Sequence, residues 1–451
     1  MDIVIKLSQF LLSLSLLIVL HEFGHFIPAR LFGTRVEKFF LFFDVKFALF
    51  KKKIGDTVYG IGWLPLGGYV KISGMIDESM DKEQMEQPAQ PWEFRSKPAW
   101  QRLIIMLGGV TVNFILAFLI YIGIAYAYGD RYIKNSDIKD GIWVTNSASL
   151  EAGFRTGDKL VSIDGKPVES FYGSMEALLL SREVTVERDG KLQTIDMPVD
   201  FIDRLMKSRE AGEGTSVIDV RIPFVIMGTE EDSPNAGVLQ ARDILVSLDG
   251  RETKYADQVI ARIGELKGQT VSAVVERDDK EVPVEITVSD AGKMGVSYAP
   301  GLGLSNIERL GIYEVSREQY SFVESIPEGL KRGKDRVVSY GKQLKMIFNP
   351  ETGAYKGVGG FKAIFDLFPQ TWSWQAFWEI TAILSIMLGV LNLLPIPALD
   401  GGHVMFLLYE MVSGRKPSDK FMEYAQMAGF FILLALVLFA NGNDIYRALF
   451  K

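Results

Sequence analysis

The sequence predicts a polytopic α-helical membrane protein with four transmembrane helices, a membrane-associated β-hairpin and two inserted α/β domains. Three observations lead to this fold class. Four long apolar segments are separated by charged ones, one segment of the central part occurs twice, and the 451 residues combine 48% hydrophobic with 23% charged residues. A chain of this length has room for several units, and this composition requires membrane and soluble parts to alternate.

The apolar segments and their flanks divide the chain into nine parts. A transmembrane helix needs about 20 apolar residues to cross a bilayer. The two apolar segments nearest the C-terminus are shorter, which indicates local thinning of the bilayer or irregular backbone at the ends of these helices. Cleavage of the first span as a signal peptide would remove a histidine motif at its end, so we expect an uncleaved anchor. The expected parts are spans at 1–27, 103–128, 378–396 and 425–451, loops at 28–102 and 397–424, domains at 129–215 and 216–303, and a periplasmic or interfacial helical connector at 304–377.

Basic residues predict the orientation of these parts. They follow the first span, precede the second and lie between the third and fourth, which places these loops in the cytoplasm by the positive-inside rule. Both termini and 129–377 then lie on the far side. The residues are Arg30, Arg35, Lys38, Lys46, Lys51, Lys52, Lys53, Arg95, Lys97, Arg102, Arg415, Lys416 and Lys420.

The end of the first apolar segment carries the motif that predicts chemistry, His21-Glu22-Phe23-Gly24-His25. On a helix this spacing puts both imidazoles on one face, where they can share a zinc ion. Glu22 is placed to take a proton from a water on the metal. The chain has only three histidines, and residues 7–20 hold no charge, so the motif lies at membrane depth, where ionisable groups are by default functional.

A second apolar stretch, 58–72, lies in the first cytoplasmic loop and is too short to span a bilayer. Its β-branched and aromatic residues with interspersed glycines predict a hairpin at the membrane edge. An unpaired strand edge is tolerated at that depth only beside protein or water, so we expect an edge that faces a cavity. The alternative is a small cytoplasmic hairpin that packs on the first span.

The soluble part contains an internal repeat, because 152–165 returns at 236–250 with one extra residue. Each copy predicts a turn, a buried strand and an Asp-Gly turn into the next strand. The copies resemble PDZ domains in their bacterial, strand-permuted form, which typically take a peptide as an added strand. The second copy has Arg242 near the place of Gly157, so we expect its turn to lose a residue free to take positive φ. Rigid spacers or size filters are the alternative role.

A catalytic zinc needs a third protein ligand and an open position. Two candidates, Asp400 and His403, follow the Pro395-Ile-Pro397 break at the cytoplasmic end of the third span, where the first span also ends. Asp400 follows directly on the break, and histidine is the commoner zinc ligand. Spacing alone does not choose between them.

Taken together, these motifs resemble the site-2 protease family of intramembrane zinc metalloproteases, specifically the bacterial regulator-of-sigma-E type with two PDZ domains. The resemblance covers nearly the whole chain and rests on 21–25, 67–71, Gly109-x-x-x-Asn113 and 399–401. It implies Asp400 as the third zinc ligand, with a structural role left to His403.

The resemblance also implies how substrate is held. Asn392 and the hairpin residues Gly67, Gly68 and Tyr69 would hold an unwound substrate, while Gly109 and Asn113 would pack near the site. The expected substrates are single-span proteins of the anti-sigma-factor type after a first cut, and remnant signal peptides. The expected location is the bacterial inner membrane, with the PDZ-like domains in the periplasm and peptide C-termini as their ligands.

The sequence leaves two other functions open. A catalytically inactive, membrane-anchored PDZ scaffold would lack a ligand or Glu22, and both histidines and the glutamate are present. A metal transporter needs ligands but no base, and it tends to show inverted repeats, which the spans lack. The net charge of −7 argues against nucleic acid as a partner, and the absence of cysteine excludes thiolate zinc sites.

Overall fold

The structure is a computed structural model, and it describes residues 2–65, 67–75, 87–214, 216–298 and 304–450. The chain divides into two compact units, one formed by 1–129, 319–344 and 358–451, and the other by 130–318 and 345–357. The described residues of the first unit contain four helices long and apolar enough to cross a membrane. These are α1 (Asp2–Leu31), α3 (Ala99–Tyr128), α11 (Trp374–Asn392) and α13 (Asp419–Phe450).

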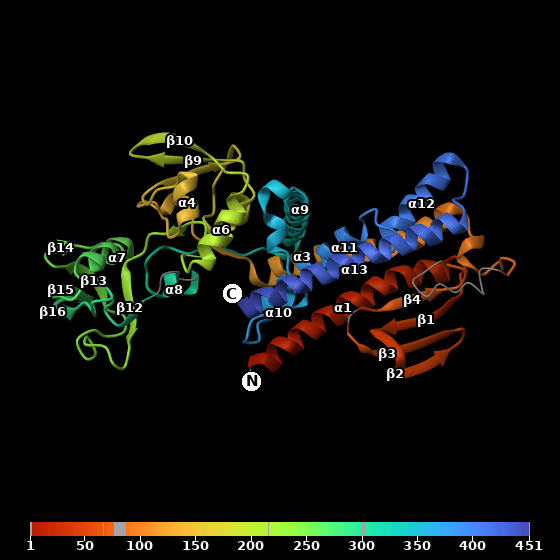
Figure 1. The fold of residues 1–451 in the computed structure, drawn as a ribbon, viewed down its shortest axis with the longest axis horizontal. Helices are drawn as coiled ribbons and strands as arrows, with labels where there is room; N and C mark the ends of the chain where they lie inside the picture. The colour runs from red at the N-terminus through yellow and green to blue at the C-terminus, as the bar shows by residue number, and fades with distance from the viewer. Residues whose placement is uncertain (1, 66, 76–86, 215, 299–303, 451) are drawn as a thin grey trace. The chain divides into compact units, whose positions relative to one another are not determined.

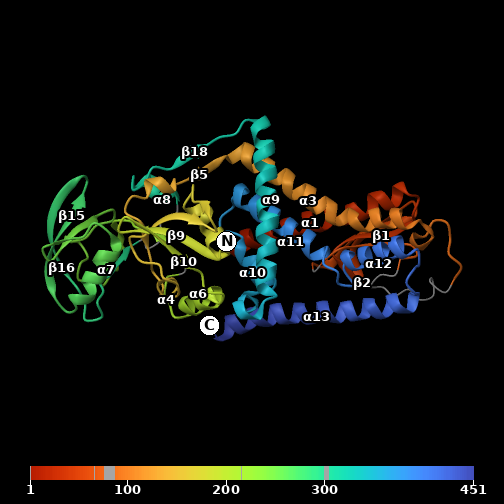
Figure 2. The ribbon, with the colours of Figure 1, turned by 90° about the horizontal axis from the view of Figure 1, so that it is seen from above.

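Helix α3 is the centre of the first unit and packs against both α1 and α11 (Figure 2). The contact with α1 is a backbone crossing: a Cβ on Gly24 would lie 2.4 Å from the carbonyl oxygen of Gly108, and one on Gly108 would lie 1.9 Å from that of Gly24. Only glycine allows such an approach, as is typical of helix pairs in membranes. The crossing brings the His-Glu-x-x-His turn of α1 directly against α3.

The other helices of this unit pack beside the four candidate spans (Figure 1), with α9 lying across α3 (Figure 2). Helix α9 crosses α3, because Gly329 and Gly333 pack against Ile122 and Phe118. Helix α13 is tied at its far end: the Asp444 carboxylate accepts from the backbone N–H of Gly360 at the start of α10 (2.9 Å). The remaining elements are the 3-10 turn Phe94–Ser96, α9 (Phe322–Ile347), α10 (Phe361–Leu367) and α12 (Asp400–Ser413).

The stretch 58–72 does not form the expected hairpin. It contributes two strands to a four-stranded sheet of order β2-β3-β1-β4, in which β1 separates β3 from β4. Strand β3 pairs with β1 in parallel, and β4 pairs with β1 antiparallel, so β4 is an edge strand. The strands are β1 (Val36–Leu41), β2 (Phe43–Ile54), β3 (Thr57–Leu64) and β4 (Tyr69–Ile72).

The second unit contains two β-rich modules, the first built on a sheet within residues 159–196 and the second on a sheet within residues 224–298. They share one local arrangement, which agrees with the repeat in the sequence. In each, a buried aspartate accepts two hydrogen bonds from an arginine on a later strand: Asp158 from Arg188 (2.6 and 2.7 Å), and Asp243 from Arg277 (2.7 and 2.6 Å). Both aspartates are 1% exposed. Each Asp-Gly turn has positive φ at both residues, which suits a tight hairpin.

The expected loss of a positive-φ residue in the second copy does not occur. Arg242 itself adopts φ +77°, and Gly157 has φ +98° at the equivalent place. The N–H of Arg242 donates to Ile226 O (2.7 Å), as the N–H of Gly157 donates to Ile142 O (2.8 Å). The second turn therefore keeps its shape with a residue that rarely adopts this conformation.

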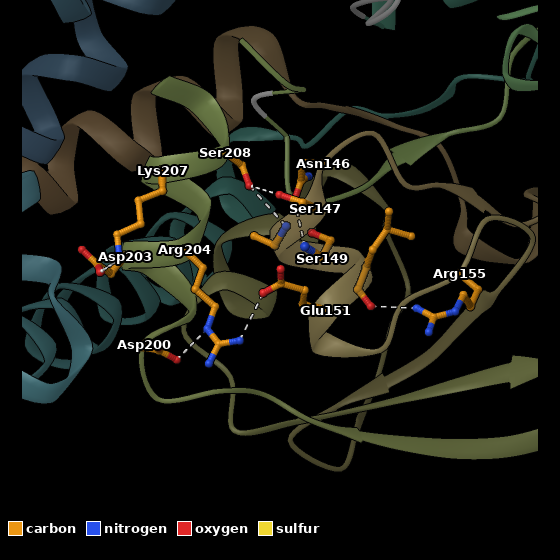
Figure 3. Close-up of polar contacts among 12 residues, drawn as sticks. Asn146, Ser147, Ser149, Glu151, Arg155, Asp200, Asp203, Arg204, Lys207 and Ser208 are labelled. Atoms are coloured by element: carbon orange, nitrogen blue, oxygen red, sulfur yellow. Dashed lines mark hydrogen bonds and ion pairs between the residues drawn. The ribbon is translucent and has the colours of Figure 1, made fainter. Parts of the chain in front are cut away.

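Helix α6 is fixed to the first module by polar contacts with α4 (Figure 3). Asn146 caps α4 by accepting from the N–H of Ser149 (2.8 Å), and Ser147 and Ser208 share a hydrogen bond between their hydroxyls (2.8 Å). Arg204 of α6 donates hydrogen bonds to Asp200, which precedes α6, and to Glu151 of α4. These contacts close the first module on one side.

The elements of the second unit follow in chain order. They are β5 (Asp130–Tyr132), Asn135–Asp137, β6 (Ile142–Trp143), α4 (Ser147–Ala152), β7 (Lys159–Ile163), β8 (Lys166–Pro167), Tyr172–Ser174, α5 (Met175–Leu179), β9 (Glu183–Arg188), β10 (Lys191–Asp196), α6 (Phe201–Glu210), β11 (Asp219–Val220), β12 (Phe224–Thr229), β13 (Ile244–Leu248), β14 (Arg251–Glu252), α7 (Ala256–Glu265), β15 (Thr270–Arg277), β16 (Lys280–Thr287), β17 (Val296–Tyr298), α8 (Leu304–Arg309), β18 (Ser316–Glu318), Pro350–Thr352 and Ala354–Gly357.

Candidate metal centre

Three potential ligand atoms from distant parts of the sequence meet within the first unit. His21 and His25 lie one turn apart on α1, and their Nε2 atoms are 3.3 Å apart. Oδ2 of Asp400 lies 3.4 Å from Nε2 of His21 and 3.3 Å from Nε2 of His25. These residues are the group of three His, Asp or Glu side chains in the described chain whose ligand atoms could hold one metal ion.

The segment before Asp400 has the backbone that this meeting requires. Ala398 has φ +90°, a conformation that a residue with a Cβ adopts only when its surroundings impose it. Asp400 then opens α12, where the sequence predicted a loop. A Cβ on Gly401 would lie 2.2 Å from the carbonyl oxygen of Leu394, so glycine allows α12 to start against the end of α11.

The distances and the donor set fit zinc. Tetrahedral zinc with ligands at about 2.0–2.1 Å holds neighbouring ligand atoms about 3.3–3.4 Å apart. The carboxylate oxygen Oδ2 of Asp400 is buried and has no hydrogen-bond partner among the described residues. Because a buried anionic oxygen without a partner is costly, its position between two imidazole nitrogens fits a cation.

Residues of helix α3 contact the imidazole rings of both His21 and His25. The Nδ1–H of His25 donates to the backbone carbonyl of Ile105 (2.8 Å), which leaves the Nε2 lone pair for a metal. The amide nitrogen Nδ2 of Asn113 lies 3.0 Å from Nδ1 of His21. A Cβ on Gly109 would lie 2.3 Å from Nε2 of His25 and 2.6 Å from Cε1 of His21, so glycine is needed where the rings meet α3.

The ligand atoms open onto a cavity of about 440 Å³. Glu22 and His403 line it together with the two α1 histidines and Asp400. His403 is therefore close to the ligand atoms but outside the group of three. The cavity is large enough for a short stretch of peptide beside the metal ligands.

Some of the predicted substrate-binding residues line the cavity and others do not. Gly68 and Tyr69 line the cavity. A Cβ on Gly67 would instead meet the Phe43 ring at 2.9 Å, so this glycine serves packing of the sheet. Asn392, the last residue of α11, lies with Nδ2 3.4 Å from Nε2 of His21.

Two contributors to the site were missed in the sequence. The Ile105 carbonyl carries no side-chain signature, so no motif could have indicated it. Gln426 of α13 also lines the cavity and is 5% exposed. It is a polar residue within an apolar run, and that interruption is the signal that could have singled it out.

A helical bundle with membrane-length helices and a His-His-Asp group beside a glutamate defines a class of protein, the membrane-embedded metalloproteases. The chain belongs to peptidase family M50, which it matches over residues 9–436. A metal-dependent peptidase needs both metal ligands and a base, and the His-His-Asp group beside Glu22 offers both kinds of side chain.

Relatives of similar length agree with this assignment. The regulator of sigma-E protease RseP of Escherichia coli is 28% identical, with 98% of each chain covered. The regulator of sigma E protease of Haemophilus influenzae is 27% identical over 98% of this chain and 99% of its own. Other relatives carry the words zinc metalloprotease in their names, among them one from Neisseria meningitidis that is 28% identical over 98% and 99%.

Part of the chain is similar to a PDZ domain of known structure. The PDZ domain of the SdrC-like protein from Listeria monocytogenes covers 17% of this chain and 87% of its own at 26% identity, with a TM-score of 0.16.

Proposed function

We propose that this metalloprotease is a zinc-dependent intramembrane endopeptidase that hydrolyses peptide bonds within or near the transmembrane segment of single-span substrates. The observation that carries the proposal is the triangle of His21 Nε2, His25 Nε2 and Asp400 Oδ2, with sides of 3.3–3.4 Å. It lies on a helix long and apolar enough to cross a membrane, beside a cavity that Glu22 lines.

His21, His25 and Asp400 would hold the zinc ion. Bound zinc supplies the Lewis acidity that activates water for peptide hydrolysis near neutral pH. Glu22 takes the proton from the attacking water and later passes a proton to the leaving amine. Glu22 follows His21 directly in the chain and lines the same cavity, which supports this role.

Asn113 orients the imidazole of His21 in this proposal. Binding through Nε2 requires the proton of the ring on Nδ1, and Nδ1 then needs an acceptor. A carboxamide has an oxygen for this purpose. Nδ2 of Asn113 lies 3.0 Å from Nδ1 of His21, and turning the amide by 180° would bring Oδ1, which has no partner among the described residues, to that position. With the Ile105 carbonyl doing the same for His25, α3 would set both tautomers.

An unwound substrate needs partners for its backbone. A helical substrate hides its carbonyls in its own hydrogen bonds, so it must open before attack, and water does not replace these bonds in a membrane. The edge strand β4 lines the cavity with Tyr69, Val70, Lys71 and Ile72, and it supports pairing with an extended substrate. Asn392 would add a side-chain amide near the metal.

The two modules of the second unit would be PDZ-like domains in the periplasm, with both termini on the same side and the active site near the cytoplasmic face of the inner membrane. The basic residues of the cytoplasmic loops support this orientation. The open edge of β17 beside the sheet supports the binding of peptide C-termini. The modules would exclude substrates whose ectodomains are uncut and admit trimmed anti-sigma-type proteins and signal-peptide remnants.

Cleavage of a single-span peptide in liposomes tests the catalytic proposal. We expect Glu22→Gln to lower the rate by at least about 1,000-fold without loss of zinc, since it removes only the base. Asp400→Asn should lose zinc, whereas His403→Asn should keep it, and this pair distinguishes the two ligand candidates. Zinc retained by Asp400→Asn but lost from His403→Asn would assign the third ligand to His403.

Deletion of the two modules tests the gate. An enzyme without 130–318 should cleave substrates with intact ectodomains that the full chain rejects. If rejection were unchanged by the deletion, the modules would not be the filter. Cleavage of pre-trimmed substrate by both enzymes serves as the control for an active membrane part.

A further inference from the structure

Gln426 is a buried amide that the residues around it leave unsatisfied. It lies on α13 within the apolar span 420–449, is 5% exposed, and lines the cavity that holds Glu22 and Asp400. No hydrogen bond joins its side chain to another residue that the structure describes. A carboxamide that lines a cavity and has no partner in the surrounding protein is free to pair with a molecule bound there.

The position of Gln426 is set by a close backbone contact. Three residues further along the same face of α13, a Cβ on Gly429 would lie 1.4 Å from the carbonyl oxygen of Pro397. The backbone of α13 therefore rests directly on the segment that leads to Asp400. This contact holds Gln426 at the level of the metal ligands, so its place in the cavity follows from the packing.

The chemistry of the cavity indicates what Gln426 binds. A carboxamide offers one acceptor and two donors, which is the complement of a peptide group. When an extended peptide pairs with the edge of β4, only the backbone N–H and C=O groups that face β4 form hydrogen bonds with it. The remaining backbone groups point to the opposite side, because these groups alternate along a strand. The groups on the other side need partners from a second element in a site that excludes most water.

We propose that the Gln426 amide hydrogen-bonds the backbone of the extended substrate segment, so that α13 and β4 bind the same peptide. The inference rests on the proposed function, since it requires a peptide in this cavity. It makes Gln426 a substrate-binding residue with no part in holding the metal. Recognition through the backbone would act on many substrate sequences alike.

Binding of a fluorescent single-span peptide to the full-length protein in the Glu22→Gln background tests the proposal. Gln426→Met keeps the length of the side chain and removes its hydrogen bonds, so we expect the Kd to rise about 3- to 10-fold. Zinc content should not change. Phe430→Leu, an exposed change on the same helix, serves as the control and should leave the Kd unchanged.

Replacing single backbone amides of the peptide by esters removes one N–H at a time and makes the test specific. One ester position should weaken binding to the Gln426 protein, and the same position should have no effect on the Gln426→Met variant. Identical ester profiles for the two proteins, or an unchanged Kd for Gln426→Met, would overturn the proposal. A wild type that cleaves the all-amide peptide shows that such a failure concerns Gln426 and leaves the proposed function intact.

Discussion

Gly109→Ala is the substitution that most directly probes how α3 supports the metal ligands. The new Cβ would lie 2.3 Å from Nε2 of His25, and ordinary contact begins at 3.4 Å, so the ring would have to move by about 1 Å. His25 is held at Nδ1 by the Ile105 carbonyl (2.8 Å), which opposes this movement. The Cε1 atom of His21 would be crowded as well, at 2.6 Å.

The expected magnitude follows from the geometry of zinc. Ligand distances are held within about 0.2 Å, so a displacement of about 1 Å removes a ligand. We expect zinc affinity to fall at least about 100-fold, or about 2.7 kcal/mol. Alanine is favoured over glycine in helices, so a loss of affinity cannot come from helix propensity.

Competition with a chromophoric chelator in detergent, together with zinc content per chain, measures the effect. Gly123→Ala is the matched control, because it is on the same helix and its Cβ meets nothing within 4 Å. If Gly109→Ala bound zinc within about threefold of wild type while Gly123→Ala behaved normally, the placement of the rings against α3 would be wrong.

Three further predictions concern other supports of the site and the fold. Asn113→Leu should lower zinc affinity about 10- to 100-fold. Asn113→Asp keeps an acceptor for Nδ1 of His21 and should retain zinc affinity. Equal losses of affinity for the two variants, measured by chelator competition, would contradict the orienting role of Asn113. Gly429→Ala should lower cleavage of a single-span peptide at least about tenfold by moving α13 off Pro397, whereas Gly442→Ala on the same helix, with open space around its Cβ, should not. Asp243→Ala leaves the Arg277 guanidinium without its carboxylate and should destabilise the second module by about 3 kcal/mol. The loss of stability should appear as faster proteolysis of the intact protein. If Asp243→Ala resisted proteolysis as well as Glu281→Ala, a change at an exposed residue, the prediction would be contradicted.

Local spacing was sufficient for the parts of the site that lie on one helix. His21, Glu22 and His25 could be predicted because a single turn of helix fixes their mutual positions. Asp400 and His403 are three residues apart and both line the cavity, so sequence spacing could not rank them. The 3.3–3.4 Å distances from Asp400 depend on how α12 starts against the end of α11, and that arrangement is tertiary.

Non-local pairing explains the error over 58–72. The sequence favoured a hairpin because adjacent strands usually pair, but β1 lies between β3 and β4. The strand character of 36–41 was not recognised among the basic residues of the loop. The expected open edge exists at β4, because the order of strands, and not a hairpin, leaves that side unpaired.

Peptide-bond cleavage inside the membrane is what distinguishes the proposed enzyme from a soluble metalloprotease. Mass spectrometry of the products from a single-span substrate in liposomes, with wild-type enzyme and Glu22→Gln side by side, tests it most directly. We expect Glu22-dependent cleavage of one or a few neighbouring bonds within the apolar span. Cleavage confined to the soluble flanks, or a cut that persists in Glu22→Gln, would contradict it.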